Sequence, residues 1–292
     1  MSSAHDFSSA VLTAPPDASR RVLVTGAAGR IGSYFAEHNH ARYRLRLTDI
    51  DFGDEAHAAR VARWGETFTG SLNDLDFLKE VCHGIDTVVH LAGNPSAQAT
   101  WSNLLDTNIV GTYNVCAAAK AAGCRRVVYA SSIHAVSGYG QEIQVKTEDP
   151  VNPGDLYGVS KCFGEAMGRY LSGQEGVSFI ALRIGAFQPL ETALQPRGMA
   201  MMSHFVSHRD LDQLIARCID ADDKLRFGIF HGLSGNRFNR LDISDARDLL
   251  GYAPQDDFVQ INPELKDVDF AGRIETVQQH SPEESGMREE LR

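Results

Sequence analysis

The sequence of 292 residues predicts an α/β fold, in which helices cover both faces of a doubly wound parallel sheet and a small lobe follows near the C-terminal end. Two observations carry this prediction. Short apolar runs rich in β-branched residues alternate with helical patterns, and Gly or Asp separates the elements. The runs are apolar along nearly their whole length, which is typical of strands that are buried on both faces of a parallel sheet.

The first 185 residues hold five of the expected strands, at 21–25, 45–49, 87–91, 126–130 and 178–184. Helices are expected between them at 30–40, 74–82, 103–122 and 156–171. Gly, Pro and Met interrupt the pattern over residues 185–203. A helix at 208–220 follows, with its apolar residues at helical spacing, and then a strand at 227–231 and a helix at 243–250.

The chain is acidic, with 28 Lys and Arg against 38 Asp and Glu and a formal net charge of −10. This balance argues against a general nucleic-acid binder and weakly against binding to an anionic membrane. No stretch approaches the ~18 apolar residues of a membrane span. We therefore expect no nucleic acid and no membrane among the partners.

The five cysteines are scattered and show no metal-ligand spacing, so we expect free thiols and no metal site. The first twenty residues lack the basic start and the apolar core of a secretory signal. They are expected to be a flexible leader on a cytoplasmic protein.

A glycine-rich turn follows the first expected strand, where Gly26, Gly29 and Gly32 recur at a spacing of three before a helix. Glycines here permit a tight turn and let backbone N–H groups approach a pyrophosphate at the helix N-terminus. Asp49 ends the second strand, 17 residues after Gly32. A carboxylate in that place binds both ribose hydroxyls of NAD and repels the 2′-phosphate of NADP. The pattern indicates a Rossmann dinucleotide site, although an ordinary strand–helix turn with a capping Asp would look similar.

A tyrosine and a lysine, Tyr157 and Lys161, stand four residues apart on an expected helix, which places them on one face. A free phenol has a pKa near ~10 and is a poor base at pH 7. A neighbouring ammonium and the charge of a nicotinamide favour the phenolate, which could take a proton from an alcohol while hydride leaves for NAD⁺. Ser132 follows the preceding strand at the edge where ligands bind, so its hydroxyl can hydrogen-bond the reacting oxygen.

Together, the segments TGAAGRIG at 25–32, HLAG at 90–93, SS at 131–132 and YGVSK at 157–161, with Asp49 and Asn108, resemble an extended short-chain dehydrogenase/reductase of the NAD-dependent epimerase/dehydratase family. The resemblance covers residues 21–262. It implies that Ser132, Tyr157 and Lys161 are catalytic. It also implies that Asn108 supports the active-site helix or a proton-relay water.

The resemblance also implies which residues bind NAD. Arg30 is expected to meet the pyrophosphate or the substrate, Leu72 to flank the adenine, and Lys161 to bind the nicotinamide ribose. The full expected set is Gly26, Gly29, Arg30, Ile31, Gly32, Asp49, Ile50, Ser71, Leu72, Leu91, Ala92, Gly93, Asn108, Ala130, Tyr157, Lys161 and Ile184.

The same resemblance divides the chain into four parts. A leader at 1–20 precedes an NAD-binding domain at 21–185, which residues at about 226–236 complete. A small substrate lobe is expected at 186–262 and a charged tail at 263–292. The expected helices at 103–122 and 156–171 commonly form a dimer interface in this family, which implies a homodimer or a higher homo-oligomer.

Within the family, the segments LYGVSKCFGE, LRIG, FVSHRDL and LGYAPQD resemble the uronate dehydrogenases and the haloarchaeal NAD-dependent glucose-6-phosphate dehydrogenases. Those enzymes oxidise the anomeric C1 hydroxyl of a cyclic sugar to a lactone. Epimerases usually carry an asparagine shortly after the arginine that corresponds to Arg183 of the LRIG segment, and this chain lacks it. Two alternatives stay open: a nucleotide-sugar epimerase or dehydratase with tightly bound NAD, and a non-enzymatic NAD(H) sensor.

The expected substrate pocket departs from the uronate pattern at two positions. Ile133 stands where those enzymes have Asn, and Ala186 stands where they have Ser, so two polar side chains are replaced by apolar ones. The resemblance therefore predicts the type of reaction better than it predicts the substrate. The substrate could be a hexuronate, a sugar phosphate, a sulfosugar or a plain aldose. The residues expected around it are Asn94, Ser96, Ser132, Ile133, His134, Ala186 and Arg197, the last as the partner of an anionic group.

Overall fold

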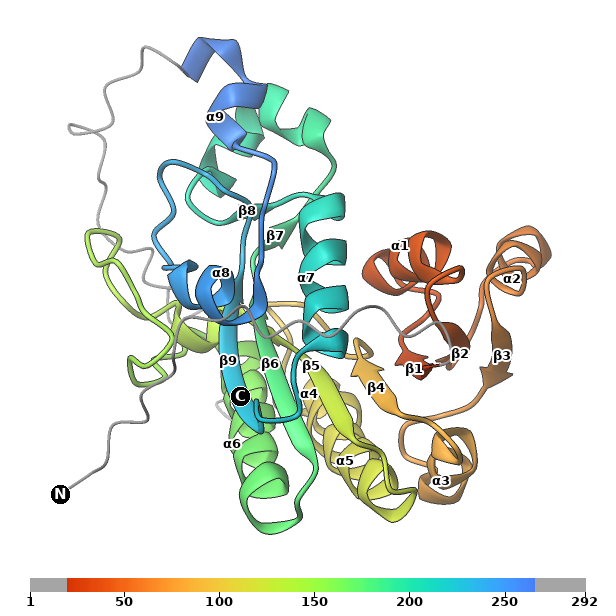
Figure 1. Cartoon of the computed structure of the whole chain (residues 1–292). Coiled ribbons are helices and arrows are strands. Elements are labelled where there is room, and N and C mark those ends of the chain that lie inside the picture. Colours follow the sequence, from red (N-terminus) through yellow and green to blue (C-terminus); the bar gives the residue numbers. More distant parts are fainter. Residues whose placement is uncertain (1–19, 266–292) are drawn as a thin grey trace, which may run out of the picture.

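The computed structural model describes residues 20–265 and confirms the predicted fold class (Figure 1). Seven parallel strands form one sheet in the order β3-β2-β1-β4-β5-β6-β9. The strands are β1 (Arg21–Thr25), β2 (Arg44–Asp49), β3 (Glu66–Thr69), β4 (Thr87–His90), β5 (Arg126–Ser132), β6 (Ser178–Ile184) and β9 (Phe227–Gly232). The order reverses between β1 and β4, and ligands bind at such a switch point in doubly wound sheets.

Two layers of helices cover the sheet, as Figure 1 shows. The helices α3 (Leu75–Cys82), α5 (Gly111–Ala121) and α6 (Leu156–Gln174) pack on one face. The helices α1 (Arg30–Asn39), α7 (His208–Asp220) and α8 (Ser244–Leu250) pack on the other. Strands β1, β4, β5 and β6 are therefore buried on both faces, which explains their continuous apolar sequences.

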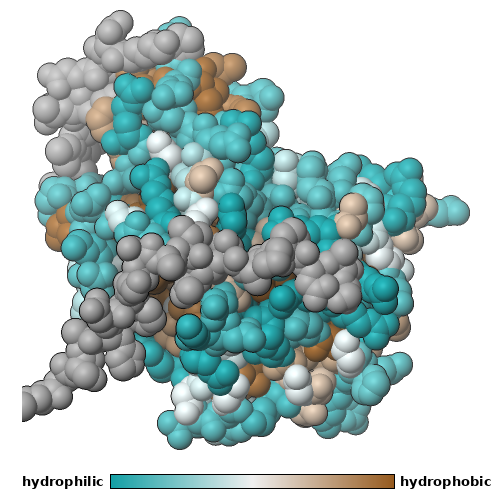
Figure 2. Space-filling view, viewed as in Figure 1, coloured by the Kyte–Doolittle hydropathy of each residue, from teal (hydrophilic) through white to brown (hydrophobic). Residues whose placement is uncertain are grey.

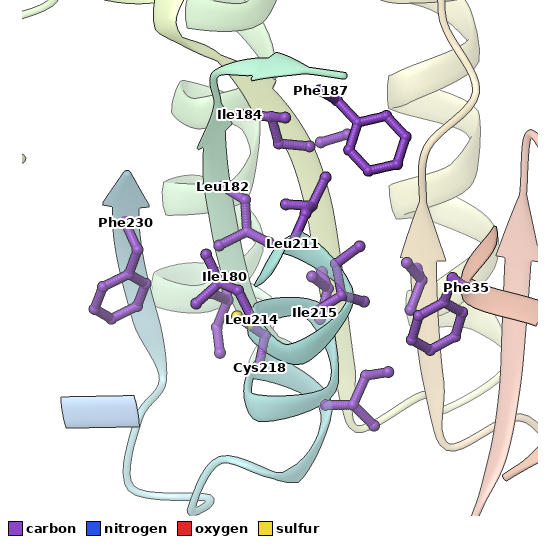
Figure 3. Packing of buried hydrophobic residues seen from close by; sticks show 14 of the residues in the cluster. Phe35, Ile180, Leu182, Ile184, Phe187, Leu211, Leu214, Ile215, Cys218 and Phe230 are labelled. Atoms are coloured by element: carbon purple, nitrogen blue, oxygen red, sulfur yellow. The ribbon is translucent and has the colours of Figure 1, made fainter. Parts of the chain in front are cut away.

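The sheet has a hydrophobic cluster on each face, and the apolar face of α7 packs into the larger of these two clusters. Its residues Leu211, Leu214 and Ile215 belong to the same hydrophobic cluster as Ile180 and Leu182 of β6 (Figure 3). All five side chains are at most 1% exposed. The helix expected at 208–220 is thus part of the layered body as well as the connection to the lobe.

A small lobe stands beyond the carboxyl ends of the strands (Figure 1). Two short parallel strands, β7 (Ala186–Phe187) and β8 (Phe205–Val206), connect it to the sheet. The lobe adds the turns η3 (Leu190–Leu194), η4 (Pro196–Met201) and η5 (Pro263–Leu265) and the helix α9 (Phe258–Ile261). Its separate core includes Phe205 and Phe258, whose rings meet edge to face.

The surface viewed in Figure 2 is mostly hydrophilic, with hydrophobic residues in scattered groups. Within the described residues, no helix is both long and apolar enough to span a membrane. The five cysteines are free, as expected. The leader and nearly all of the charged tail expected at the two ends lie outside the described residues.

Besides the short elements β7, β8 and α9, which the sequence did not predict, the structure corrects the sequence-based elements in two places. First, α2 (Glu55–Val61) and β3 were missed. Both are short, and β3 is an edge strand whose residues are exposed or half-buried, so it has no continuous apolar run.

Second, the single helix expected at 103–122 is divided into α4 (Trp101–Leu104), the π-helical segment η1 (Leu105–Val110) and α5. The wider turn of η1 carries Asn108, whose buried side chain bonds to neighbouring elements. Such π-helical turns occur often at functional sites, and helical periodicity in the sequence does not reveal them.

Replacing Leu214 with Ala should lower the free energy of unfolding by about 2–5 kcal/mol, because the side chain is fully buried between α7 and β6. Urea unfolding measures the loss. The matched control is Leu194→Ala in η3, whose side chain is 57% exposed and should cost less than about 0.5 kcal/mol. Equal losses for the two variants would contradict this description of the core.

Candidate active site

A cavity of about 260 Å³ opens at the carboxyl edge of the sheet, between the strands and the lobe. Residues of α1, β5, α6, β6 and β7 line it, together with residues that follow β4 and one that precedes β8. Thirteen of the predicted site residues line this cavity: Arg30, Ile31, Leu91, Gly93, Asn94, Ala130, Ser132, Ile133, His134, Tyr157, Lys161, Ile184 and Ala186. Segments that are up to 156 residues apart in the chain (Arg30 to Ala186) therefore meet at one place.

The glycine-rich turn forms one wall of the site. Gly26 has a φ of 71°, and a Cβ on it would lie 2.7 Å from the backbone nitrogen of Ala92. A Cβ on Gly32 would lie 2.2 Å from the carbonyl oxygen of Gly26. Gly29 caps α1 without a side-chain hydrogen bond, so the first N–H groups of the helix stay available. This geometry fits an anion such as a pyrophosphate.

Asp49 ends β2 beside this turn, as expected from the sequence. Its two carboxylate oxygens accept hydrogen bonds from the backbone N–H groups of Ala28 and Ile50, at 2.9 and 2.8 Å. The carboxylate is thereby fixed, and each oxygen keeps acceptor capacity for a ribose hydroxyl. Ile50 is 71% exposed beside it.

The expected adenine residues Ser71 and Leu72 lie just beyond β3, at the same edge of the sheet. The backbone N–H of Gly70 bonds to the carbonyl of Asp49, which holds this segment to β2. The carbonyl of Leu72 accepts from the Asn114 amide of α5. Both residues lie outside the lining of the cavity described above.

The predicted catalytic residues come from β5 and α6. Ser132 is the last residue of β5, and its hydroxyl also accepts from the backbone N–H of His134. Tyr157 stands in the first turn of α6, which Asp155 caps through the backbone N–H of Gly158. Lys161 follows one turn later, and the three predicted catalytic side chains are at most 8% exposed. The structure thus brings the serine, tyrosine and lysine to one cavity.

The ammonium of Lys161 lies among aromatic rings, with its Nζ 5.1 Å from the ring centroid of Tyr129 and 5.5 Å from that of Tyr157. Such distances allow cation–π attraction. Burial lowers the pKa of Lys161 to about 8. At neutral pH the side chain still carries its charge, and the low dielectric of the site strengthens the field that it exerts on Tyr157.

Burial also raises the pKa of Tyr157, and a hydrogen bond with Ser132 partly opposes this effect. Desolvation of the phenolate is the largest influence, because Tyr157 is almost fully buried. The negative charge of Asp155 raises the pKa of Tyr157 further. The hydroxyl of Ser132 is thus a group that stabilises the ionised form of the phenol.

Asn108 has a well-defined place in η1. Its Oδ1 accepts from the backbone N–H of Asn94, while its Nδ2 donates to the carbonyl of Asn94 and to the hydroxyl of Ser160. These bonds connect the loop after β4 to α6 between Tyr157 and Lys161. Of the two roles expected for Asn108, support of the active-site helix is the one that these contacts favour.

The expected substrate residues differ in where they lie relative to the cavity. His134 faces the cavity, and its Nδ1 lies 2.6 Å from a carboxylate oxygen of Asp155. Ser96 is exposed and is not among the residues that line the cavity, so its contact with the substrate stays a prediction. Its hydroxyl accepts from the backbone N–H of Gln98 and so stabilises a local turn. Arg197 lies in η4, and its side chain is outside the part of the chain that the structure describes.

Three polar residues of the cavity were not among the predicted site residues: Ser131, which adjoins Ser132 on β5, and Gln188 and His204. Gln188 follows β7 and His204 precedes β8. The pairing of these two strands brings the residues together, and no local motif signals it. Among the described residues, no group of three or more His, Cys, Asp or Glu side chains is arranged to hold a metal ion.

A doubly wound sheet with a glycine turn, an acidic residue at the end of β2 and a Ser-Tyr-Lys cavity defines a Rossmann-type, dinucleotide-binding protein. The family model "NAD dependent epimerase/dehydratase family" matches residues 22–209. The chain belongs to this family.

Individual relatives are similar over most of their length. The NAD-dependent glucose-6-phosphate dehydrogenase of Haloferax volcanii is 32% identical over 86% of this chain and 98% of its own. The uronate dehydrogenase of Pseudomonas putida is 32% identical over 81% of this chain and 84% of its own. The crystal structure of uronate dehydrogenase from Agrobacterium tumefaciens matches with a TM-score of 0.76 and 32% identity, over 87% of this chain and 91% of that one.

Replacing Gly32 with Ala should weaken NAD binding by roughly tenfold or more and lower the free energy of unfolding by about 1–3 kcal/mol, because the new Cβ would overlap the carbonyl of Gly26. Calorimetric titration with NAD⁺ and thermal unfolding measure the two effects. The matched control is Gly173→Ala in α6, where a Cβ meets nothing within 4 Å. If Gly32→Ala bound NAD as tightly as this control, the assignment of the turn would be wrong.

Replacing Lys161 with Met should change how stability depends on pH. The folded pKa is about 8 against an ordinary 10.5, so between these values the unfolded chain binds more protons than the folded one. The free energy of unfolding of the wild type should therefore rise, relative to the variant, by about 3 kcal/mol as pH increases through this window. Urea unfolding without NAD over this pH range tests it, and a pH-independent difference between the two proteins would refute it.

Proposed function

We propose that this protein oxidises the anomeric C1 hydroxyl of a cyclic sugar with NAD⁺ and releases a lactone. The observation that carries the proposal is the meeting of Ser132, Tyr157 and Lys161 in one cavity beside the glycine turn. The protein is an NAD-dependent oxidoreductase of the family identified above. The names of its relatives support a sugar as the substrate, because they are dehydrogenases of uronate and of glucose 6-phosphate.

The residues of the site fit NAD. The close approach of Gly26 and Gly32 to their neighbours leaves space that a Cβ would fill, and Asp49 is fixed at the end of β2. The turn would hold the pyrophosphate, Asp49 the adenosine ribose, and Lys161 the nicotinamide ribose. When bound, NAD⁺ supplies the hydride acceptor for C1.

Oxidation at C1 removes a hydride from carbon and a proton from the hydroxyl. Ser132 is placed to hydrogen-bond this hydroxyl and orient it, and the phenolic oxygen of Tyr157 takes its proton. The positive charge of Lys161 stabilises the phenolate in the buried site. These roles place the chemistry on β5 and α6, whereas the lobe is left to recognise the rest of the sugar.

The decisive experiment mixes the purified protein with NAD⁺ and a panel of five sugars: D-glucuronate, D-glucose 6-phosphate, L-arabinose, D-glucose and 6-deoxy-6-sulfo-D-glucose. We expect NADH absorbance to rise with at least one of them. Tyr157→Phe should lower kcat by about 10²–10⁴ and leave NAD binding intact, because only the proton acceptor is removed. No NADH with any sugar would count against the proposal, UDP-sugar turnover without added NAD would favour an epimerase, and an unaffected Tyr157→Phe variant would exclude this mechanism.

Two further features belong to the proposal. We propose that, besides binding the sugar, the chain associates with a second copy of itself, as a homodimer or a higher homo-oligomer. We also propose that the protein works in the cytoplasm. Light scattering of the purified protein measures its oligomeric state.

A further inference from the structure

The cavity has polar groups besides the predicted catalytic residues, although the sequence shows two polar residues of the uronate dehydrogenases replaced by Ile133 and Ala186. Ala186 lies on β7, and Gln188 follows two residues later in the extended chain. Residues two apart in a strand point to the same side. Ala186 and Gln188 both line the cavity. Phe187 between them also borders the cavity, but its side chain is 5% exposed and belongs to the main core (Figure 3).

His204 reaches the same wall from the partner strand. Its carbonyl accepts from the backbone N–H of Ala186 at 2.8 Å, and the carbonyl of Val206 accepts from the backbone N–H of Gln188 at 3.2 Å. His204 lines the cavity next to Gly185, where a Cβ would lie 2.2 Å from the His204 carbonyl. The small residues Gly185 and Ala186 therefore let β8 come close and leave room for the imidazole and the amide.

We propose that Gln188 and His204 determine the sugar specificity of the site, by hydrogen-bonding hydroxyl groups of the substrate on carbons other than C1. This inference rests on the proposed C1 oxidation, and it specifies that the lobe recognises hydroxyl groups of the sugar. An amide and a neutral imidazole each offer one donor side and one acceptor side, which matches a hydroxyl that donates and accepts. The two residues would supply the hydrogen bonds that Ile133 and Ala186 cannot make.

The electrostatic surroundings favour a hydroxyl over an anionic group as the partner of His204. Burial lowers the pKa of His204 to about 4, and the charges of Arg240 and His134 contribute to this lowering. Its ring is therefore neutral at physiological pH. The Nδ1 of His204 has one long contact, 3.3 Å to the hydroxyl of Ser203, so the ring is weakly held by its own chain.

The test uses the full chain and whichever of the five panel sugars the wild type oxidises fastest, together with the monodeoxy analogues of that sugar. Gln188→Leu and His204→Phe keep the approximate size of each side chain and remove its hydrogen-bonding atoms. We expect each to raise KM by roughly tenfold or more with kcat changed less than about threefold, because the missing hydrogen bond would stabilise ground state and transition state alike. The matched controls Gln174→Leu and His83→Phe alter exposed residues outside the cavity and should leave both constants unchanged.

The deoxy analogues separate direct contact from a structural effect. For the analogue that lacks the recognised hydroxyl, wild type and variant should show the same kcat/KM, and His204→Gln should recover part of the activity on the parent sugar. Two results would overturn the inference directly: an unchanged KM, or an equal loss of kcat/KM on the parent sugar and on every analogue. A loss of kcat/KM in His204→Phe that shrinks as pH rises would also overturn it, because it would mean that His204 acts as a cation. Failure of the wild type to oxidise any panel sugar would instead overturn the proposed function.

Discussion

The active site depends on one buried carboxylate, that of Glu165 on α6. It accepts two hydrogen bonds of 2.9 Å from the guanidinium of Arg183 on β6 and one of 2.7 Å from the hydroxyl of Ser131 on β5. All three residues are at most 4% exposed. Breaking such a pair by removing one partner typically costs about 3–5 kcal/mol, because the other charge is left buried alone. The bonds fix the register of α6 on the sheet, and with it the positions of Tyr157 and Lys161 relative to Ser132.

The same principle of internally paired charges explains how an acidic chain can offer a site to anionic NAD. The formal net charge is −10, yet the carboxylates near the cavity are engaged: Asp49 with two backbone N–H groups, and Asp155 with His134 and the start of α6. The cations Arg30 and Lys161 line the cavity itself. In a water-poor site these near charges outweigh distant ones, which solvent screens over about 8–10 Å.

Sequence reasoning located the parts of this site that depend on local pattern. The glycine turn, Asp49 and the Tyr157–Lys161 pair each lie within or beside one strand–helix unit, so spacing alone is enough to predict their place. It missed β3, whose exposed edge has no apolar run, and the π-helical turn that buries Asn108. It also missed Gln188 and His204, because their meeting depends on a β7–β8 pairing of only two residues per strand.

These successes and failures divide the site into a rigid part and an adaptable part. Ser132, Tyr157 and Lys161 lie on long elements that are anchored by the Glu165 carboxylate and by strands buried on both faces. Gln188 and His204 lie at the ends of two-residue strands, in a lobe whose small core is separate from the main one. Under the proposed function, a substitution in the lobe would alter which sugar fits with little disturbance of the residues proposed to move the proton. That separation gives a physical reason why relatives in one family act on sugars as different as uronate and glucose 6-phosphate.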